Sequence, residues 1–240
     1  MRKLRNGFQL SANAERILDA LCGDRLRFEA RRDIAVEGDD PRTFYVVLEG
    51  WACHYKQLVN GKRQIVSLLV PGDLSPPTAA LPHALDHTVA TVTPVVVAQI
   101  STSALAEAFA AEPLVEKVFS WNALLAAAML RESVVSLGRR SAMERLAHFI
   151  CELHFRLSMI EVDDPMNIDL PITQSELADL LGLSTVHINR SLQHLRATNL
   201  ITLVGHDLRI LNLGTLREVA HFDPSYLQQK IRTDLNFRQN

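Results

Sequence analysis

Short apolar runs separated by turn residues fill residues 28–110 and predict β-strands. Asn60-Gly61 is a strong two-residue hairpin signal, because both residues tolerate the positive φ angles of a tight turn. Many short strands of this kind predict a small barrel or roll. The runs are Phe44–Leu48, 51–59, 62–70 and 88–100, with turns at Glu49-Gly50, Asn60-Gly61, Pro71-Gly72-Asp73 and Pro94.

Apolar residues at helical spacing lie on both sides of this region. Residues 1–27 predict a short helical lead-in with Ile17, Leu18 and Leu21 as its apolar stripe. From residue 112, apolar positions recur every three or four residues and predict one helix of about 25 residues. Residues 136–141 form a predicted hinge, and residues 142–157 a further helix.

The long helix carries two apolar stripes. A helix on the outside of a single domain needs only one such face, so the second is free to pack on a partner copy. The alternative, that both faces are buried within one chain, stays open. The first stripe is Val118, Trp121, Leu125, Ala128, Glu132 and Val135, and the second is Val115, Phe119, Asn122, Ala126 and Met129.

Residues 172–196 predict two short helices joined by a tight turn. Thr173 and Glu176 have the spacing of a capping box, and Gly182 suits a turn that needs positive φ. Ser184 can cap the second helix. On that helix Ile188, Leu192 and Leu195 point inward, while Thr185, Val186, His187, Asn189 and Arg190 point outward.

This is the plan of a DNA-binding helix-turn-helix, although an ordinary helical hairpin shares part of the pattern. Two further apolar runs, 200–203 and 208–211, surround Gly205-His206-Asp207 and predict a β-hairpin. Helix-turn-helix and hairpin together make a winged helix.

Composition agrees with a globular protein of two domains. The chain has 240 residues, of which 48% are hydrophobic and 22% charged. No uninterrupted apolar run approaches the roughly 18–20 residues that span a bilayer, and no apolar segment follows the basic N-terminus as in a secretory signal. Cys22, Cys53 and Cys151 are odd in number and far apart, which favours a reducing compartment, the cytoplasm, over a disulfide framework.

Charge is distributed unevenly. The formal net charge is −2, yet Arg190, Arg196, Arg209 and Arg217 stand against Asp207 alone in residues 184–217, a local balance of +3. A modest positive surface suffices for DNA when two copies act together, because phosphate contacts add up. The preceding acidic residues are Glu161, Asp163, Asp164, Asp169, Glu176 and Asp179.

With roll, long helix, hinge and winged helix in this order, the chain resembles the Crp/Fnr family of bacterial transcription regulators. The resemblance covers nearly all of the chain. It is carried by Glu49-Gly50, by Pro71-Gly72-Asp73-Leu74, and by the helix-turn-helix segments 172–178 and 183–190. It implies an α+β fold: an N-terminal β-roll of the cyclic-nucleotide-binding, double-stranded jelly-roll type, a long dimerisation helix and a C-terminal winged helix-turn-helix.

The resemblance also implies which role each part of the chain has. Residues 1–111 are the expected sensor domain with its helical lead-in, 112–137 the dimerisation helix and 138–240 the DNA-binding domain. The expected partners are double-stranded DNA with a palindromic operator, a second copy of the chain and RNA polymerase, with no membrane. An effector at the roll is expected to reorient the DNA-binding domains about the hinge.

Departures from the family pattern bear on the effector. Members that bind cyclic nucleotides carry Gly-Glu and Arg-Ser pairs, which align here with Pro76-Pro77 and His87-Thr88. Proline has no backbone N–H to donate, and a neutral histidine is a poor substitute for a guanidinium. We therefore expect an effector other than cyclic AMP, or none. The candidate pocket residues are Leu74, Pro76, Pro77, His87 and Thr88.

No cofactor or metal is predicted. The N-terminal cysteine cluster of the family's iron–sulfur sensors is missing, since only Cys22 lies in that region. His54, His83 and His87 lie in or near the candidate pocket, so a haem or metal role is a minor alternative. A redox role for Cys53 or Cys151 is similarly weak, because nothing nearby in sequence lowers a thiol pKa. A Gly-rich phosphate loop and the common hydrolase motifs are missing from the sequence, which argues against an enzyme.

Arg190 is the strongest candidate for reading DNA sequence. A guanidinium can donate two hydrogen bonds to guanine, and the resemblance places Arg190 on the family's base-reading arginine. Many members have a glutamate four residues earlier, where this chain has Val186, so we expect a different base preference there. The competing function is a ligand-binding or protein-interaction module whose winged helix no longer binds DNA. The other candidate DNA contacts are Asn189, Thr185, His187, Ser184, Thr173 and Gln174.

Overall fold

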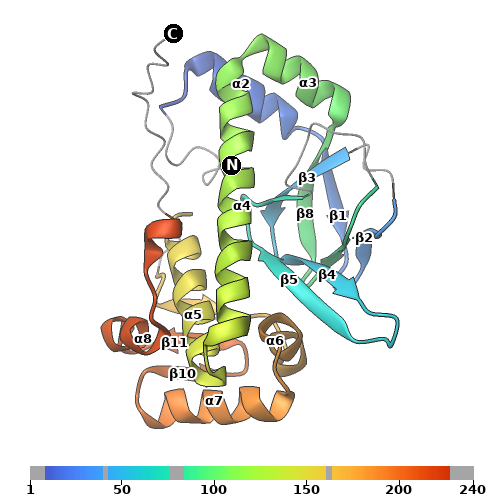
Figure 1. Cartoon of the computed structure of the whole chain (residues 1–240). Coiled ribbons are helices and arrows are strands. Elements are labelled where there is room, and N and C mark those ends of the chain that lie inside the picture. The colour runs from blue at the N-terminus through green and yellow to red at the C-terminus, as the bar shows by residue number, and fades with distance from the viewer. Residues whose placement is uncertain (1–8, 40–42, 76–83, 161–163, 228–240) are drawn as a thin grey trace, which may run out of the picture.

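The computed structural model describes residues 9–39, 43–75, 84–160 and 164–227. A β-rich N-terminal part and a mainly helical C-terminal part lie along one long helix, α4 (Figure 1). The chain is therefore an α+β protein with the order of parts expected from the sequence.

The N-terminal part contains two four-stranded antiparallel sheets, with strand orders β1-β8-β3-β6 and β2-β7-β4-β5. Together they form the β-roll. As predicted, β4 and β5 pair on either side of Asn60-Gly61, and Pro94 separates β7 from β8. The strands are β1 Arg25–Phe28, β2 Asp33–Ala35, β3 Thr43–Glu49, β4 Ala52–Gln57, β5 Arg63–Leu69, β6 Leu74–Ser75, β7 Thr88–Thr91 and β8 Val95–Ser101.

Gly50 shows why the turn after β3 needs glycine. Its φ is 79°, and a Cβ added there would lie 2.1 Å from the carbonyl oxygen of Pro94. Any side chain would push the two turns apart.

Two helices close one end of the roll. They are α2 Ala12–Leu21, which confirms the predicted lead-in helix, and α3 Thr102–Ala111. The second corrects the expectation that residues 28–110 are only β-rich. Ser101 caps α3 by accepting a hydrogen bond from the Ala104 amide, and Leu105 and Ala108 are buried against neighbouring helices.

The long helix α4 spans Pro113–Arg139, 27 residues, as its period predicts. It continues through Gly138 to Arg139, and the backbone becomes extended at Arg140, where ψ is 142°. The break therefore lies at the C-terminal end of the predicted hinge segment.

The faces of α4 differ from the expectation. Much of both predicted stripes is buried within this chain, including Val115, Phe119 and Asn122 of the stripe that was free to face a partner. For those residues the alternative holds, because they are buried within one chain; Val115 and Phe119 pack among residues of α2, α3 and the β-roll. A different set of apolar side chains is exposed, and we call it the α4 outer face. It consists of Leu124, Leu130, Val134, Val135 and Leu137.

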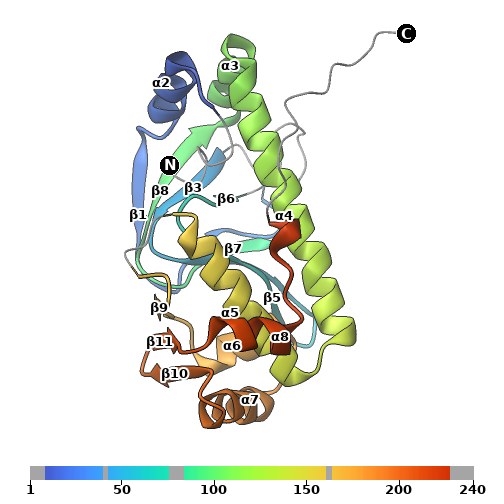
Figure 2. The ribbon, with the colours of Figure 1, turned by 90° about the vertical axis from the view of Figure 1, so that its left-hand side faces the viewer.

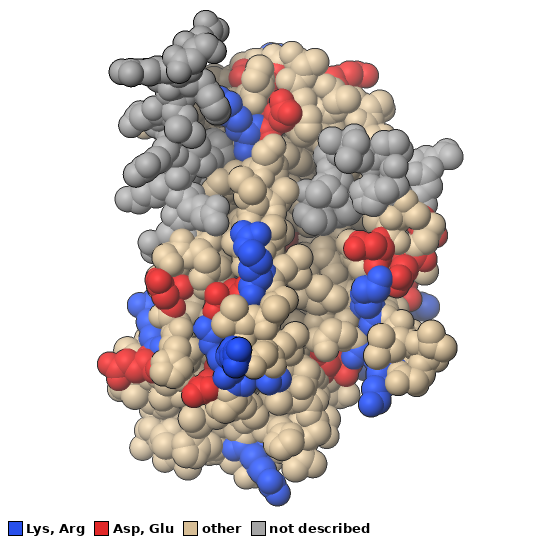
Figure 3. All heavy atoms as spheres, in the orientation of Figure 1, with Lys and Arg blue, Asp and Glu red and all other residues tan. Residues whose placement is uncertain are grey.

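Figure 3 shows uncharged surface over much of α4, interrupted by a few Lys and Arg side chains. By length and composition alone, α4 is apolar enough to cross a membrane, with a third of its most apolar 18-residue window buried. The core helix of a protein outside membranes meets the same criterion, and α4 packs on α2, α3 and η1 here.

In the C-terminal part helices α5, α6 and α7 pack on one another, and α7 contacts a three-stranded sheet of order β10-β11-β9. The predicted helix after the hinge, the helix pair and the hairpin are all confirmed, whereas β9 and α8 are additions. The elements are α5 Ala142–Ser158, β9 Asn167–Asp169, α6 Gln174–Leu181, α7 Thr185–Ala197, β10 Ile201–Val204, β11 Asp207–Ile210, α8 Leu213–Ala220 and the 3-10 helix η1 Pro224–Tyr226.

Candidate DNA-binding surface and sensor cavity

The turn between α6 and α7 is built as its sequence predicts. At the start of α6, the Glu176 amide donates to the Thr173 hydroxyl over 3.2 Å, and the Thr173 amide donates to the Glu176 carboxylate over 2.8 Å. Gly182 ends α6 in the left-handed conformation, with φ 61°. Ser184 then caps α7 by accepting a hydrogen bond from the His187 amide.

Helix α7 has one buried and one exposed face. Ile188, Leu192 and Leu195 are at most 4% exposed and pack towards α5 and α6. Figures 1 and 2 place α7 at one end of the molecule, where its outer side is free. The predicted outward residues Ser184, Thr185, Val186, His187, Asn189 and Arg190 are all exposed.

The start of α6 contributes less than predicted. Thr173 is half-buried, and its hydroxyl also donates to the Glu176 carboxylate over 2.8 Å, so the cap occupies this group. Gln174 is exposed, and its side-chain oxygen accepts a hydrogen bond from Asn189 over 3.4 Å. The two predicted contacts Gln174 and Asn189 therefore share one patch.

Sequence reasoning missed part of this surface. Gln193 and His194 are exposed one turn beyond Asn189 and Arg190, so the helical repeat itself was the signal. On the hairpin, Thr202 and Arg209 are exposed on paired positions, and Val204 at the tip is 77% exposed.

The charge of this surface is positive. Arg190, Arg196 and Arg209 are exposed, and Arg217 is half-buried. Asp179, one of the acidic residues that precede the region, forms an ion pair with Arg63 of β5 at 2.8 Å. The negative charge of Asp179 is thus compensated by an arginine of the β-roll.

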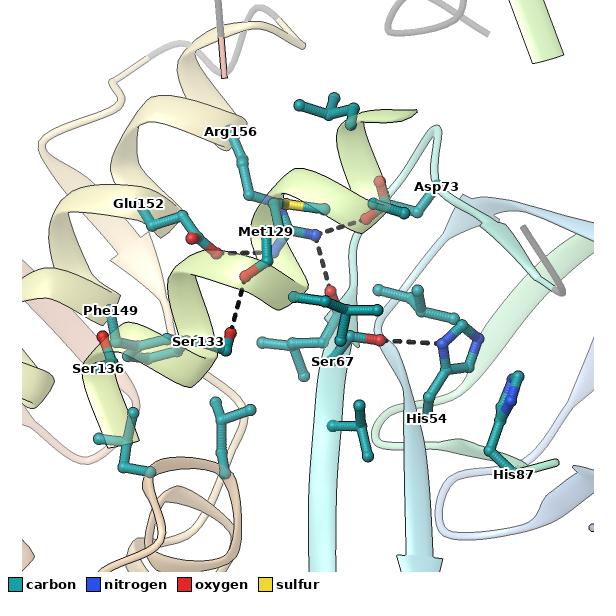
Figure 4. Close-up of a pocket in the computed structure, with 18 of the residues that line it drawn as sticks. His54, Ser67, Asp73, His87, Met129, Ser133, Ser136, Phe149, Glu152 and Arg156 are labelled. Carbon is teal, nitrogen blue, oxygen red and sulfur yellow. Dashed lines mark hydrogen bonds and ion pairs between the residues drawn. The ribbon is translucent and has the colours of Figure 1, made fainter. Parts of the chain in front are cut away.

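A cavity of about 480 Å³ lies between strands β4 and β5 and helices α4 and α5 (Figure 4). Two predicted pocket residues, Leu74 and His87, line it. Thr88 does not: it is 6% exposed within β7, and its hydroxyl accepts a hydrogen bond from the Glu37 amide. Pro76, Pro77 and the alternative ligand His83 lie outside the described residues.

His54 is fixed in the wall of the cavity by two serines. Its Nε2 lies 2.7 Å from the Ser75 hydroxyl and its Nδ1 lies 2.9 Å from the Ser67 hydroxyl. Burial, and secondarily the neighbouring His87, lower the pKa of His54 to about 3, so the ring is neutral. With both nitrogens engaged, His54 is a poor metal ligand, and the described residues hold no group of three or more His, Cys, Asp or Glu suited to a metal.

Sequence reasoning also missed Arg156, which is 4% exposed and crosses from α5 to the β-roll (Figure 4). One guanidinium nitrogen lies 2.6 Å from the Asp73 carboxylate and 2.7 Å from the carbonyl oxygen of Leu68. Burial alone would lower the pKa of Arg156, but Asp73 and Glu152 raise it above its usual value, so the pair is ionised. This contact joins residues 83 positions apart, which no local pattern reveals.

The cysteines show no activated thiol. Cys22, Cys53 and Cys151 are all free and buried. Burial raises the pKa of both Cys53 and Cys151 to about 12, so these thiols stay protonated at neutral pH.

Comparison with known proteins agrees with this arrangement. Residues 25–112 match the cyclic nucleotide-binding domain, and residues 144–219 match the Crp-like helix-turn-helix domain. The nitrogen fixation regulation protein FixK of Bradyrhizobium diazoefficiens is 27% identical over 198 residues, which cover 82% of each chain. The transcriptional activator protein FnrL of Cereibacter sphaeroides is 28% identical over 181 residues, 74% of this chain and 72% of that protein.

Solved structures share the fold. FixK2 from Bradyrhizobium japonicum superposes with a TM-score of 0.73 at 22% identity, over 81% of this chain and 96% of that one. The c-di-GMP responsive regulator CLP from Xanthomonas campestris superposes with a TM-score of 0.65 at 18% identity, over 84% of this chain and 100% of that one.

Proposed function

The chain belongs to the Crp/Fnr family of DNA-binding transcription regulators, and from this premise we propose that it acts as a homodimer that reads a palindromic operator with α7. In this proposal residues 1–111 form the sensor domain, 112–137 the dimerisation helix and 138–240 the DNA-binding domain. It works in the cytoplasm, where its DNA lies, and RNA polymerase is a further proposed partner.

The observation that carries the proposal is the exposed edge of α7. Arg190 stands beside Asn189 on a helix whose other face is fully packed, so the edge can enter a major groove without unfolding anything. A bidentate arginine–guanine contact contributes about 1–3 kcal/mol of discrimination. Asn189, Gln174 and the exposed arginines supply further base or phosphate contacts.

The α4 outer face supports the dimer. Its leucines and valines are each at least 41% exposed, and a second copy of the same helix would bury them. Leu130 and Leu137 also line the cavity, so the interface would run along the edge of the cavity. A two-fold axis along α4 would bring two α7 helices to one side of a duplex. The operator would then have half-sites about one helical turn, 34–36 Å, apart.

Cyclic AMP is not the proposed effector. The position that needs a phosphate-binding arginine holds His87, whose Nδ1 lies 2.7 Å from the Asp86 carboxylate. A carboxylate beside this ring repels a phosphate. The proposal therefore includes no cofactor and leaves the cavity for another class of ligand.

Selection from a random duplex library, followed by binding assays, tests the proposal. We expect Arg190→Ala to lose roughly 5- to 150-fold of the preference for the selected operator over random DNA, the equivalent of about 1–3 kcal/mol. Arg196→Ala is the matched control, because Arg196 is exposed on the same helix and should weaken binding to all sequences alike.

Two outcomes would contradict the proposal. An Arg190→Ala variant that keeps the full sequence preference would remove Arg190 from the reading surface. A folded wild-type protein that prefers no duplex over random competitor would favour the competing function, an interaction module whose winged helix does not bind DNA.

A further inference from the structure

We propose that the cavity between the β-roll and helices α4 and α5 is a receptor site for an uncharged, mainly apolar small molecule that carries one O–H or N–H group. The proposal rests on the proposed function, in which this chain is a regulator with a sensor domain. It assigns the class of molecule sensed.

Size and walls fit such a ligand. A volume of about 480 Å³ lies in the range of about 300–1,000 Å³ that small-molecule sites occupy. The walls are mainly apolar and come from the β-roll, α4, α5 and α6. Six of the apolar residues are Leu68, Leu69, Leu125, Met129, Phe149 and Leu181.

The Lys and Arg side chains of the cavity wall already bind carboxylates or carbonyl oxygens, which argues against an anionic ligand. Arg145 donates to the carbonyl oxygens of Leu137, Arg140 and Leu181, all within 3.1 Å. Lys56 binds the Glu37 carboxylate at 2.7 Å and also the carbonyl oxygen of Asp86. Arg156 is held by Asp73 and by the Leu68 carbonyl, as described above. To bind one of these side chains, an anion would have to replace hydrogen bonds or ion pairs that the side chain already makes.

The acidic side chains of the wall are partnered as well, which argues against a cationic ligand. Asp73 binds Arg156 and also accepts a hydrogen bond from the Val70 amide at 2.8 Å. Glu152 accepts a hydrogen bond from the Tyr226 hydroxyl at 2.7 Å and lies 3.7 Å from Arg156. Asp86 accepts a hydrogen bond from His87 Nδ1 at 2.7 Å, and its side chain is 82% exposed to solvent. A charged ligand of either sign would therefore leave a protein charge unpaired.

Three buried nitrogens of residues that line the cavity make no hydrogen bond to the described residues: His87 Nε2, His148 Nε2 and Arg156 Nε. His148 Nε2 lies 3.4 Å from the Glu132 carboxylate, and Arg156 is already held through another nitrogen. His87 Nε2 is buried and has no hydrogen bond within the described structure, and the ring lies beside His54 with centroids 4.3 Å apart. The Asp86 carboxylate can only accept, so the proton lies on Nδ1. In the neutral ring Nε2 is then an acceptor, which a ligand O–H or N–H would satisfy.

A pair of fluorescent probes tests the charge and polarity of the site in the full chain. N-Phenyl-1-naphthylamine is uncharged and apolar and has one N–H group. 1-Anilinonaphthalene-8-sulfonate has the same rings with a negative charge. We expect saturable binding of the uncharged probe with one site per chain, and at least 10-fold weaker binding of the sulfonate. Equal or tighter binding of the sulfonate, or no saturable binding of the uncharged probe, would overturn the proposal.

Two cavity-filling variants locate the site. Ala126 and Ser133 line the cavity from α4, so Ala126→Phe and Ser133→Phe should each weaken the uncharged probe at least 10-fold. Ala106→Phe is the control, because Ala106 is exposed on α3 and lines no part of the cavity. Circular dichroism establishes that each variant is folded. Undiminished probe binding by a folded variant of either cavity residue would place the site elsewhere and refute the proposal.

Gel shifts on the same samples separate this proposal from the proposed function. Wild-type protein that binds its selected operator but not the uncharged probe refutes only the ligand class. Protein that binds the probe in the cavity but prefers no duplex supports the site and refutes the regulator.

Discussion

Val186 is the residue at which this chain departs from its family on the reading helix. It is 56% exposed on α7 and lies one turn before Arg190. A valine offers only apolar contact, for instance to a thymine methyl, whereas a carboxylate accepts a hydrogen bond from cytosine N4. We expect Val186→Glu to change the preferred base at one position of each half-site in a duplex selection. Val186→Thr is the near-isosteric control, and an unchanged consensus for Val186→Glu would refute this role of Val186.

Buried histidines make stability depend on pH. Burial lowers the pKa of His54 and of His148 to about 3, against about 6.5 in the unfolded chain. Between these two pKa values the unfolded state binds more protons than the folded state. The contribution of each ring to the free energy of unfolding is therefore highest above pH 6.5 and falls as the pH is lowered. The expected loss is about 1.4 kcal/mol per pH unit for each ring below pH 6.

Urea unfolding at pH 7.5, 6.5, 5.5 and 5.0 measures this loss before most carboxylates titrate. His54→Gln removes one of the titrating rings and should flatten the dependence, as should His148→Gln. A variant as steep as the wild type would mean that its ring is not held neutral in the folded protein.

Residues whose roles are local were predictable from the sequence. The Thr173 cap, the Ser184 cap and Gly182 depend on neighbours within four positions, so spacing alone identified them. Arg156 and His54 were not predictable in the same way. Their partners, Asp73 and Ser75, come from distant segments, and a polar residue in an apolar run does not reveal what it pairs with.

At the scale of elements, the α4 outer face makes a prediction about assembly. Leu130 is 41% exposed and Val134 is 69% exposed on the side that a second copy would cover. A charge buried in that interface is costly, so Leu130→Glu and Val134→Glu should each shift a dimer to monomers in sedimentation velocity. Leu58→Glu is the matched control, since Leu58 is 60% exposed on the β4–β5 turn. A dimer that tolerates both α4 changes, or a wild type that is monomeric, would exclude this interface.

Elements with strong periodic patterns were predicted, and weakly patterned ones were missed. The 27-residue α4 and the hairpin at Asn60-Gly61 each carry an unambiguous signal. Helix α3 follows a β-rich region directly, and its many alanines give little contrast between an apolar and a polar face. Strand β9 has three residues and exists because β11 offers it an edge, which is a tertiary cause.

At the scale of the whole molecule, the sequence shows which positions are apolar but not what covers them. That is why the stripe with Val115 and Phe119 could equally have faced a partner, although the chain's own helices and the β-roll bury both residues. The same limit applies to the contact between the β-roll and the C-terminal part. Arg63 and Asp179, and likewise Arg156 and Asp73, are unremarkable until folding brings the two parts together.

These two ion pairs lie across the same contact but differ in burial, so they should differ in strength. The Arg156 and Asp73 side chains are 5% and 8% exposed, whereas those of Arg63 and Asp179 are 35% and 27% exposed. Removing one partner of a buried pair leaves an uncompensated charge, which typically costs about 3–5 kcal/mol. An exposed pair contributes about 0–1 kcal/mol, because water screens both charges.

Double-mutant cycles in urea unfolding test the difference. Arg156→Met and Asp73→Asn should each destabilise strongly, and the double variant should cost less than the sum of the two, with a coupling of about 2–3 kcal/mol. The Arg63→Met and Asp179→Asn cycle is the control, with a coupling of less than about 1 kcal/mol. If the couplings are equal, burial does not set the strength of the contact. If Arg156→Met has no effect, the buried pair is not what holds the C-terminal part against the β-roll, and the Arg63 pair with the apolar packing around it must do so.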